Sequence, residues 1–450
     1  MSAPTRLWCE WAWTGSADGA PEPGVLLEVA GGRFTAVTAR TAAPADAEVL
    51  PGVTLPGLAD AHSHAFHRAL RGRTHADGGS FWTWREVMYR VADRLDPDTY
   101  LRLARAVYAE MALAGVTCVG EFHYLHHAPG GVRYTDPNEM GRALVAAAAD
   151  AGVRLTLLDV CYLAGGLEPD GTYRPLSGPQ TRFGDGDAAG WAERVRSFGP
   201  LPGHALLGTA AHSVRAVPAR ELPEVAAAAA GIGGPLHVHL SEQPAENAAC
   251  LAAHGRTPTA VLGDAGLLGE GTSLVHATHL TDGDVAAIRG SRSVVCLCPT
   301  TERDLADGLP RTGDLDARRL SLGSDQHARI DMFEEARAVE LHERLRTHRR
   351  GTLGAGDLLR AATAHATLGW DDAGALAAGA RADLVNVPLE GVRLAGADPA
   401  RGVDAVVFAA DASDVRNVMA DGRWTVRDGV HTRMPDLARD LDTVIKEILK

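Results

Sequence analysis

"LPGLADAHSHAFHRALRG", residues 55–72, places two histidines one residue apart, directly after a run of apolar and small residues. Side chains two positions apart on a β-strand point to the same face. His62 and His64 would therefore present two imidazoles side by side, an arrangement that suits a divalent metal. The stretch predicts half of a metal site at a strand end, and distant parts of the chain must supply the other ligands.

The composition is that of a large globular protein. The chain has 450 residues, of which 46% are hydrophobic and 22% are charged, enough for an α/β barrel with an added lobe. The net charge of −13 argues against nucleic acid and anionic membranes as partners, whereas local arginines could still hold a small anionic substrate. No apolar run approaches the roughly 20 residues that span a bilayer, and the first residues do not resemble a signal peptide. We therefore expect a cytoplasmic protein.

Eight short apolar runs alternate with helical patterns, which is typical of a (β/α)8 barrel. The helical patterns include residues 97–114, 140–151 and 220–230. The eight candidate strands are 55–62, 116–124, 153–161, 204–212, 235–242, 272–278, 293–299 and 320–327. Most of these runs end in His, Asp or Glu, and catalytic residues of such barrels lie at the carboxyl ends of the strands.

Both ends of the chain are rich in strand patterns. Residues 24–40 read as two strands around a Gly-Gly turn; residues 382–390, 402–409 and 415–428 read as further strands, the last with an Asp-Gly turn. We therefore predict an α/β fold: a TIM-like (β/α)8 barrel over residues 57–374, with a small β-sandwich domain made from both chain ends, residues 1–56 and 375–450.

Later strands offer the missing ligands and a base. "HVHLSEQ" contains His237, His239 and Glu242, "LVHATH" contains His276, and "LGSDQH" contains Asp325. A mononuclear site would take His62, His64, one histidine of the 235–242 strand and Asp325, and would keep one position open for water.

These residue types suit hydrolysis. A divalent metal lowers the pKa of a water molecule that it binds. Asp325 could accept a hydrogen bond from that water, Glu242 could carry a proton to the substrate nitrogen, and a neutral His276 could orient the water.

Taken together, "PGLADAHSH", "HLSE", "VHATH", "GSDQH" and "ADLVNVP" resemble the amidohydrolase superfamily along essentially the whole chain. The resemblance implies His62, His64, His239 and Asp325 as metal ligands. It also implies Glu242 as the proton shuttle and His276 as the partner of the nucleophilic water. By the same resemblance, His237 is not a ligand. We expect it to be a polar residue packed in the barrel wall.

A narrower resemblance is to the N-formimidoyl-L-glutamate deiminases, carried by "AHSHAFHRALRGR", "FWTWREVMYR", "GEFHYLHH", "HSVRAV" and "CPTTERDLADG". It implies hydrolysis of a formimidoyl C=N bond in histidine degradation, a zinc ion and a homodimer, although three histidines and an aspartate also suit iron or manganese. The substrate-binding residues that it implies are His67, Arg85, Tyr124, His212 and Arg215. His67 stands where the family usually has Gln. Arg85 and Arg215 could each hold one carboxylate of the substrate as a charge-assisted pair.

Three alternatives remain open. The chain could be another mononuclear deaminase acting on a purine, pyrimidine or triazine ring, or a barrel without activity that serves as a scaffold. His123, His126 and His127 could suggest a second metal. Against that, the only lysines are Lys446 and Lys450, so no barrel lysine could be carbamylated to bridge two metals.

Overall fold

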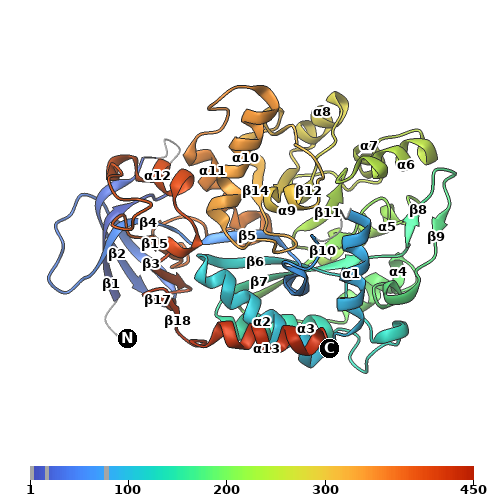
Figure 1. Ribbon diagram of the computed structural model, residues 1–450, viewed down its shortest axis with the longest axis horizontal. Coiled ribbons are helices and arrows are strands. Elements are labelled where there is room, and N and C mark those ends of the chain that lie inside the picture. Colours follow the sequence, from blue (N-terminus) through green and yellow to red (C-terminus); the bar gives the residue numbers. More distant parts are fainter. Residues whose placement is uncertain (1–4, 16–19, 76–80) are drawn as a thin grey trace.

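Two eight-stranded sheets organise the chain in the computed structural model, which describes residues 5–15, 20–75 and 81–450 (Figure 1). In the first sheet every neighbouring pair of strands is parallel. Its strands are β5 (Leu58–Ser63), β6 (Val116–His123), β7 (Arg154–Cys161), β10 (Ala205–Ala211), β11 (Leu236–Leu240), β12 (Thr272–His276), β13 (Val294–Leu297) and β14 (Leu320–Leu322). These strands correspond to the eight predicted ones and form the barrel.

The first and last strands meet and close the barrel. The Asp325 N–H donates to the His62 carbonyl at 2.9 Å, and the His64 N–H donates to the Asp325 carbonyl at 3.1 Å. Asp60 accepts hydrogen bonds from the backbone and the hydroxyl of Ser324 at 3.0 and 2.5 Å. A Cβ on Gly323 would lie 2.7 Å from the Cβ of His62, so this close approach requires glycine. Closure therefore brings the His-x-His motif against Asp325.

Helices surround the barrel. They are α1 (Phe81–Asp93), α2 (Pro97–Leu113), α3 (Glu139–Ala151), α4 (Ala188–Arg196), α5 (Leu222–Ile232), α6 (Pro244–His254), α7 (Pro258–Asp264), α8 (Asp282–Ser291), α9 (Pro299–Asp304), α10 (Met332–Thr347) and α11 (Ala355–Ala362). α2 shows why such segments are helical: Asp96 and Thr99 form a reciprocal capping box, and Pro97 occupies the first helical position. Three of these helices, α2, α3 and α5, match the three predicted helical segments.

The second sheet joins both ends of the chain, in the order β18-β17-β16-β15-β4-β1-β2-β3. Its strands are β1 (Thr5–Ala12), β2 (Glu22–Ala30), β3 (Arg33–Thr38), β4 (Glu48–Pro56), β15 (Leu384–Val387), β16 (Asn417–Ala420), β17 (Arg423–Arg427) and β18 (Val430–His431). β4 pairs with β1 on one side and with β15 on the other, so blue and red strands lie together in Figure 1. The predicted fold class, a parallel barrel with a β-domain from both ends, is confirmed.

One predicted strand is wrong. Residues 402–409 form a helix, α12 (Gly402–Ala409). Val403, Val406 and Val407 are buried, and their spacing of three and four residues is that of one helix face. A Cβ on Gly402 would come within 2.5 Å of Val53, so the helix begins close against β4. The valine content, typical of strands, concealed this helical spacing.

The predicted strand over residues 55–62 is two strands in the structure. β4 ends at Pro56 in the terminal sheet, and β5 begins at Leu58 in the barrel. Gly57 lies between them, where a Cβ would be 2.3 Å from the Thr117 hydroxyl. We propose this glycine as the boundary between the β-domain and the barrel, with the return near residue 375.

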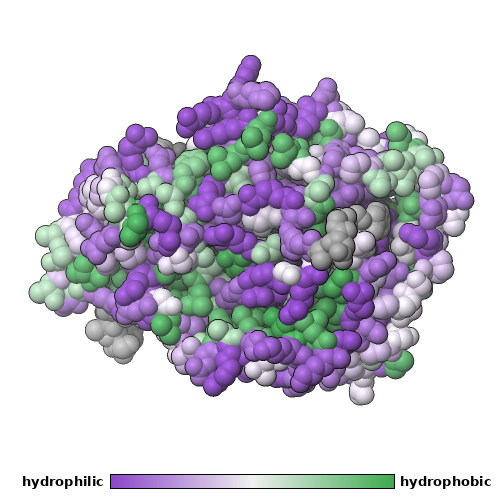
Figure 2. Space-filling view, viewed as in Figure 1, coloured by the Kyte–Doolittle hydropathy of each residue, from purple (hydrophilic) through white to green (hydrophobic). Residues whose placement is uncertain are grey.

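A helix at the end of the chain, α13 (Leu437–Ile448), was not predicted. It buries Leu437, Leu441, Val444, Ile445 and Ile448 and packs along α2. Figure 2 shows hydrophilic residues over its outer face, as expected for an amphipathic helix. Among the described residues, none of the helices has the length and apolar character needed to cross a bilayer.

Candidate active site

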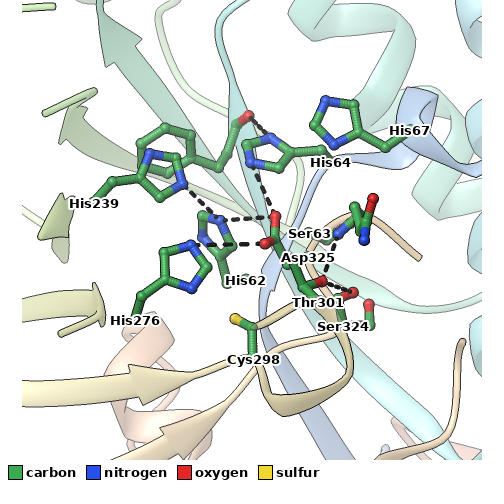
Figure 3. Close-up of polar contacts among 12 residues, drawn as sticks. His62, Ser63, His64, His67, His239, His276, Cys298, Thr301, Ser324 and Asp325 are labelled. Carbon is green, nitrogen blue, oxygen red and sulfur yellow. Dashed lines mark hydrogen bonds and ion pairs between the residues drawn. The ribbon is translucent and has the colours of Figure 1, made fainter. Parts of the chain in front are cut away.

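Four predicted metal ligands converge at the carboxyl ends of the barrel strands (Figure 3). Nε2 of His62 and Nε2 of His239 lie 3.1 Å apart. Oδ1 of Asp325 lies 3.5 Å from Nε2 of His62 and 3.4 Å from Nε2 of His64. All four side chains are buried. β5, β11 and the segment after β14 thus supply one cluster from distant parts of the sequence.

Backbone carbonyls fix the tautomers of two of these histidines. Nδ1 of His64 lies 3.0 Å from the Phe122 carbonyl, and Nδ1 of His239 lies 3.1 Å from the His212 carbonyl. A carbonyl only accepts hydrogen bonds, so each Nδ1 donates and each Nε2 keeps a lone pair when the ring is neutral. Burial, together with the charge of His62, lowers the pKa of His64 to about 3. The ring nitrogens that face the centre of the cluster are therefore free to bind a cation.

The spacing of the donors fits a divalent cation. Donors about 2.0 Å from a tetrahedral zinc ion lie about 3.3 Å from one another, and the three measured separations are 3.1, 3.4 and 3.5 Å. Three imidazoles and one carboxylate also suit the chemistry of zinc, iron or manganese. The residues present therefore fit the expected metal.

His276 faces this cluster from the end of β12. Its Nε2 lies 3.7 Å from Oδ2 of Asp325 and 3.9 Å from Oε1 of Glu242, and its Nδ1 lies 3.4 Å from Oε1 of Glu302. Burial alone would lower the pKa of His276, but the Glu302 hydrogen bond and the neighbouring carboxylates raise it to about 10. These carboxylates favour the cation when no metal is bound, whereas a divalent metal beside Asp325 would oppose that charge and favour the neutral ring expected from the sequence.

Glu242 follows β11 and is held by a buried ion pair. Its Oε2 accepts a hydrogen bond from Nη2 of Arg215 at 2.8 Å. Nε of the same guanidinium lies 3.6 Å from Oε2 of Glu246, which also accepts the Glu242 backbone N–H at 3.3 Å. Burial opposes the charge of Arg215, whereas Glu246 and then Glu242 raise its pKa. One guanidinium is thus shared between two buried carboxylates.

A cavity of about 290 Å³ opens onto the cluster. All five predicted substrate-binding residues line it: His67, Arg85, Tyr124, His212 and Arg215. His64, His239, Glu242, His276 and Asp325 line it too, while His62 lies beneath them. The structure therefore brings every predicted site residue to one place.

The contacts of the predicted substrate-binding residues are mostly with neutral groups. His67 Nε2 lies 2.9 Å from the Tyr124 hydroxyl. Arg85 donates to the Tyr162 hydroxyl at 3.1 Å and lies over the Tyr89 ring, 5.2 Å from its centre. These contacts position the side chains around the cavity without adding negative charge to it.

Several residues of the site were missed from the sequence: Tyr162, Arg174, Glu246 and Glu302. Glu302 lies in the first turn of α9, where the Cys298 N–H also donates to it at 2.9 Å. Glu246 lies four residues after Glu242 in the first turn of α6. Glu246 and Glu302 could have been predicted from the sequence, because each is an acidic residue that follows a predicted strand within a few positions.

The second histidine cluster does not fit a metal. His123, His126 and Asp159 lie close together, but Arg194 donates to both oxygens of Asp159 at 2.8 Å. The Trp191 indole donates to the same carboxylate at 3.1 Å. Asp159 is thus already neutralised by a bidentate arginine, and the cluster is a buried structural network.

His237 lies deeper in the barrel than His239 on the same strand, β11. Its Nε2 is 3.4 Å from the Thr367 carbonyl, which belongs to the segment that covers the opposite end of the barrel. His237 therefore lies away from the ligand cluster.

The chain is similar in sequence to known proteins. A family model described as the amidohydrolase family matches residues 53–425. A Pseudomonas aeruginosa protein named formimidoylglutamate deiminase is 39% identical over 419 residues, which cover 90% of this chain and 91% of that protein. An 8-oxoguanine deaminase from the same organism is 28% identical over 402 residues, covering 84% and 83% of the two chains.

Solved structures share the fold. An amidohydrolase from Brucella melitensis has a TM-score of 0.87 and 30% identity, with 99% of this chain and 100% of that chain covered. An adenosine deaminase from Xanthomonas campestris with bound zinc has a TM-score of 0.81 at 22% identity, with 99% of each chain covered; at that identity the likeness concerns the fold alone. The chain therefore belongs to the amidohydrolase family, a family of metal-dependent hydrolases.

Proposed function

We propose that the protein hydrolyses the formimidoyl C=N bond of N-formimidoyl-L-glutamate to N-formyl-L-glutamate and ammonia, a step of histidine degradation. The single observation that carries this proposal is that Arg85 and Arg215 line the same cavity as the ligand cluster and Glu242. Two guanidiniums suit a substrate with two carboxylates. The similarity to the Pseudomonas aeruginosa formimidoylglutamate deiminase supports the same substrate.

In this proposal His62, His64, His239 and Asp325 hold one divalent cation, which we propose to be zinc. When bound, such a cation lowers the pKa of water and so makes a nucleophile available at neutral pH. Asp325 Oδ2 lies 3.7 Å from Nε2 of His276, so the two side chains flank the same space. We assign both of them to orienting the water molecule that attacks the formimidoyl carbon.

Substrate binding uses the walls of the cavity. Arg85 and Arg215 each take one carboxylate through charge-assisted hydrogen bonds. His67, Tyr124 and His212 contribute hydrogen bonds from imidazole and phenol groups, and the His67–Tyr124 contact of 2.9 Å fixes two of these relative to one another. Such fixed contacts hold the formimidoyl group next to the cluster.

Glu242 moves the protons. The reaction adds one water to the amidine: the carbon gains the water oxygen, the bond to the imino nitrogen breaks, and both water protons end on that nitrogen as it leaves as ammonia. Glu242 accepts a proton from the water and delivers it to the imino nitrogen, which is general acid–base catalysis by one carboxylate. Its position 3.9 Å from His276 and on the cavity wall suits that transfer.

The test is ammonia release from a panel of substrates, with the metal content of the same preparation measured by mass spectrometry. N-formimidoyl-L-glutamate is compared with N-formimidoyl-L-aspartate, guanine and cytosine. We expect N-formimidoyl-L-glutamate to be preferred by a preparation that holds one metal ion per chain. Faster turnover of a ring substrate would replace this proposal by that of a ring deaminase, and a metal-loaded protein inactive on all four would remove the proposal.

A further inference from the structure

We propose that Arg215 gates Glu242: it holds this carboxylate until a carboxylate of the substrate takes over the guanidinium and releases Glu242 for proton transfer. The inference rests on the proposed function. It makes the acidic group of the substrate a requirement for turnover as well as for binding.

The gate is built from a buried group of three charges. The side chains of Arg215, Glu242 and Glu246 are 14%, 8% and 0% exposed. Arg215 Nη2 donates to Glu242 at 2.8 Å, while its Nε lies 3.6 Å from Glu246. Two edges of one guanidinium thus face two carboxylates. All three residues line the cavity, so a substrate carboxylate can reach the guanidinium.

The ion pair opposes the chemistry proposed for Glu242. Protonating this carboxylate would discard its attraction to Arg215, and the Glu242 side chain is only 8% exposed. The guanidinium carries five N–H donors in a fixed plane, so it can turn its Nη2 edge to another carboxylate while Glu246 keeps the Nε edge. The group has two negative charges and one positive charge, and the substrate brings a third carboxylate that competes with Glu242.

An amidine without carboxylates distinguishes two roles for Arg215: a clamp, which only binds the substrate, and a gate, which also restrains Glu242. A clamp that only binds the substrate has no effect on an amidine that lacks carboxylates. A gate keeps the enzyme slow on that amidine, because nothing displaces Glu242 from Arg215. Removing the guanidinium should then speed the reaction. The charge-assisted hydrogen bond that is lost predicts an increase of about tenfold or more.

The experiment compares N-formimidoyl-L-glutamate with N-propylformamidine, which has the same reacting group and no carboxylate. Wild-type protein and Arg215→Met are loaded with metal, checked by circular dichroism and metal analysis, and assayed for kcat and KM. Arg220→Met is the matched control, because it removes an arginine that is 77% exposed, pairs with Glu221 and does not line the cavity. We expect Arg215→Met, and not Arg220→Met, to raise kcat on N-propylformamidine at least about tenfold.

Acetate provides a second readout that needs no variant. It should raise kcat of the wild type on N-propylformamidine relative to chloride at equal ionic strength, and it should have no such effect on Arg215→Met. Absence of both the increase in Arg215→Met and the acetate effect would overturn the gate and leave the proposed function standing. Absence of turnover of N-formimidoyl-L-glutamate by the wild type would overturn both.

Discussion

Replacing Arg85 with Met tests whether the cavity recognises a dicarboxylate. Arg85 is half-buried and is positioned by neutral groups: the Tyr162 hydroxyl accepts its Nη2 at 3.1 Å, and the Tyr89 ring lies 5.2 Å from the guanidinium carbon. Gln180 donates to the hydroxyls of both tyrosines, at 3.0 and 3.3 Å. The guanidinium is therefore ordered before substrate arrives, and little binding energy is spent on positioning it.

The size of the effect follows from the contact that is lost. A hydrogen bond to a charged group contributes about 1.5–3 kcal/mol, which corresponds to about 10-fold to 150-fold in kcat/KM. Methionine keeps the length and apolar character of the stem while removing the charge. Arg85→Lys should lie between the two, because an ammonium cannot make the bidentate contact.

The assay is steady-state ammonia release from N-formimidoyl-L-glutamate. Arg220→Met is the matched control, since Arg220 is 77% exposed, pairs with Glu221 and does not line the cavity. We expect the control to keep the wild-type kcat/KM. A loss below about threefold in Arg85→Met, equivalent to about 0.6 kcal/mol, would refute the role given to Arg85. So would an equal loss on an amidine without carboxylates.

Three further predictions concern the proton shuttle, the departure from the family pattern and the fold. Glu242→Gln should keep its metal and its circular dichroism spectrum but lose at least about 100-fold in kcat; turnover near that of the wild type would remove Glu242 from its role. His67→Gln should lower KM for N-formimidoyl-L-glutamate, because one ring nitrogen of His67 is already engaged with the Tyr124 hydroxyl, whereas an amide carries two N–H donors and an acceptor on one group; an unchanged KM would separate residue 67 from substrate binding. Asp383→Asn should lower the free energy of unfolding in urea by about 3–5 kcal/mol, because Arg154 donates to Asp383 at 2.5 and 3.0 Å with both side chains 1% exposed. Burial raises the pKa of Asp383, but Arg154 lowers it further, so the net shift is downward; the contribution of the pair is therefore present above the ordinary aspartate pKa and is lost as pH falls below it. A change under about 1 kcal/mol at pH 7 would contradict this last prediction.

The barrel was predictable because its strands carry two kinds of information at once. Each is a short apolar run, and many end in a residue that a buried strand would otherwise exclude, such as His62 or His276. The terminal sheet was predictable only in part. β4 and β15 pair although they are far apart in the chain. The local sequence of each strand does not indicate which distant strand it pairs with.

Two helices near the end of the chain were not predicted from the local sequence. Residues 402–409 are rich in valine, which favours strands, yet Val403, Val406 and Val407 pack as one helix face. α13 was not predicted, although its buried Leu437, Leu441, Val444, Ile445 and Ile448 follow the three- and four-residue spacing of one helix face. Both helices are fixed by the surfaces that they cover.

The site was predictable to the extent that its motifs lie at strand ends. His62, His64, His239 and Asp325 follow that rule, and the structure brings them together. Glu246 and Glu302 act on the site through contacts with Arg215 and His276. Those contacts depend on how α6 and α9 turn back over the barrel, which single-residue patterns do not encode.

X-ray diffraction data collected above and below the absorption edge of the metal found by mass spectrometry test the central claim most directly. We predict one anomalous peak per chain, bounded by Nε2 of His62, His64 and His239 and by the Asp325 carboxylate. A peak at His123, His126 and Asp159 instead, or a fully active crystal with no peak among the four predicted ligands, would contradict it.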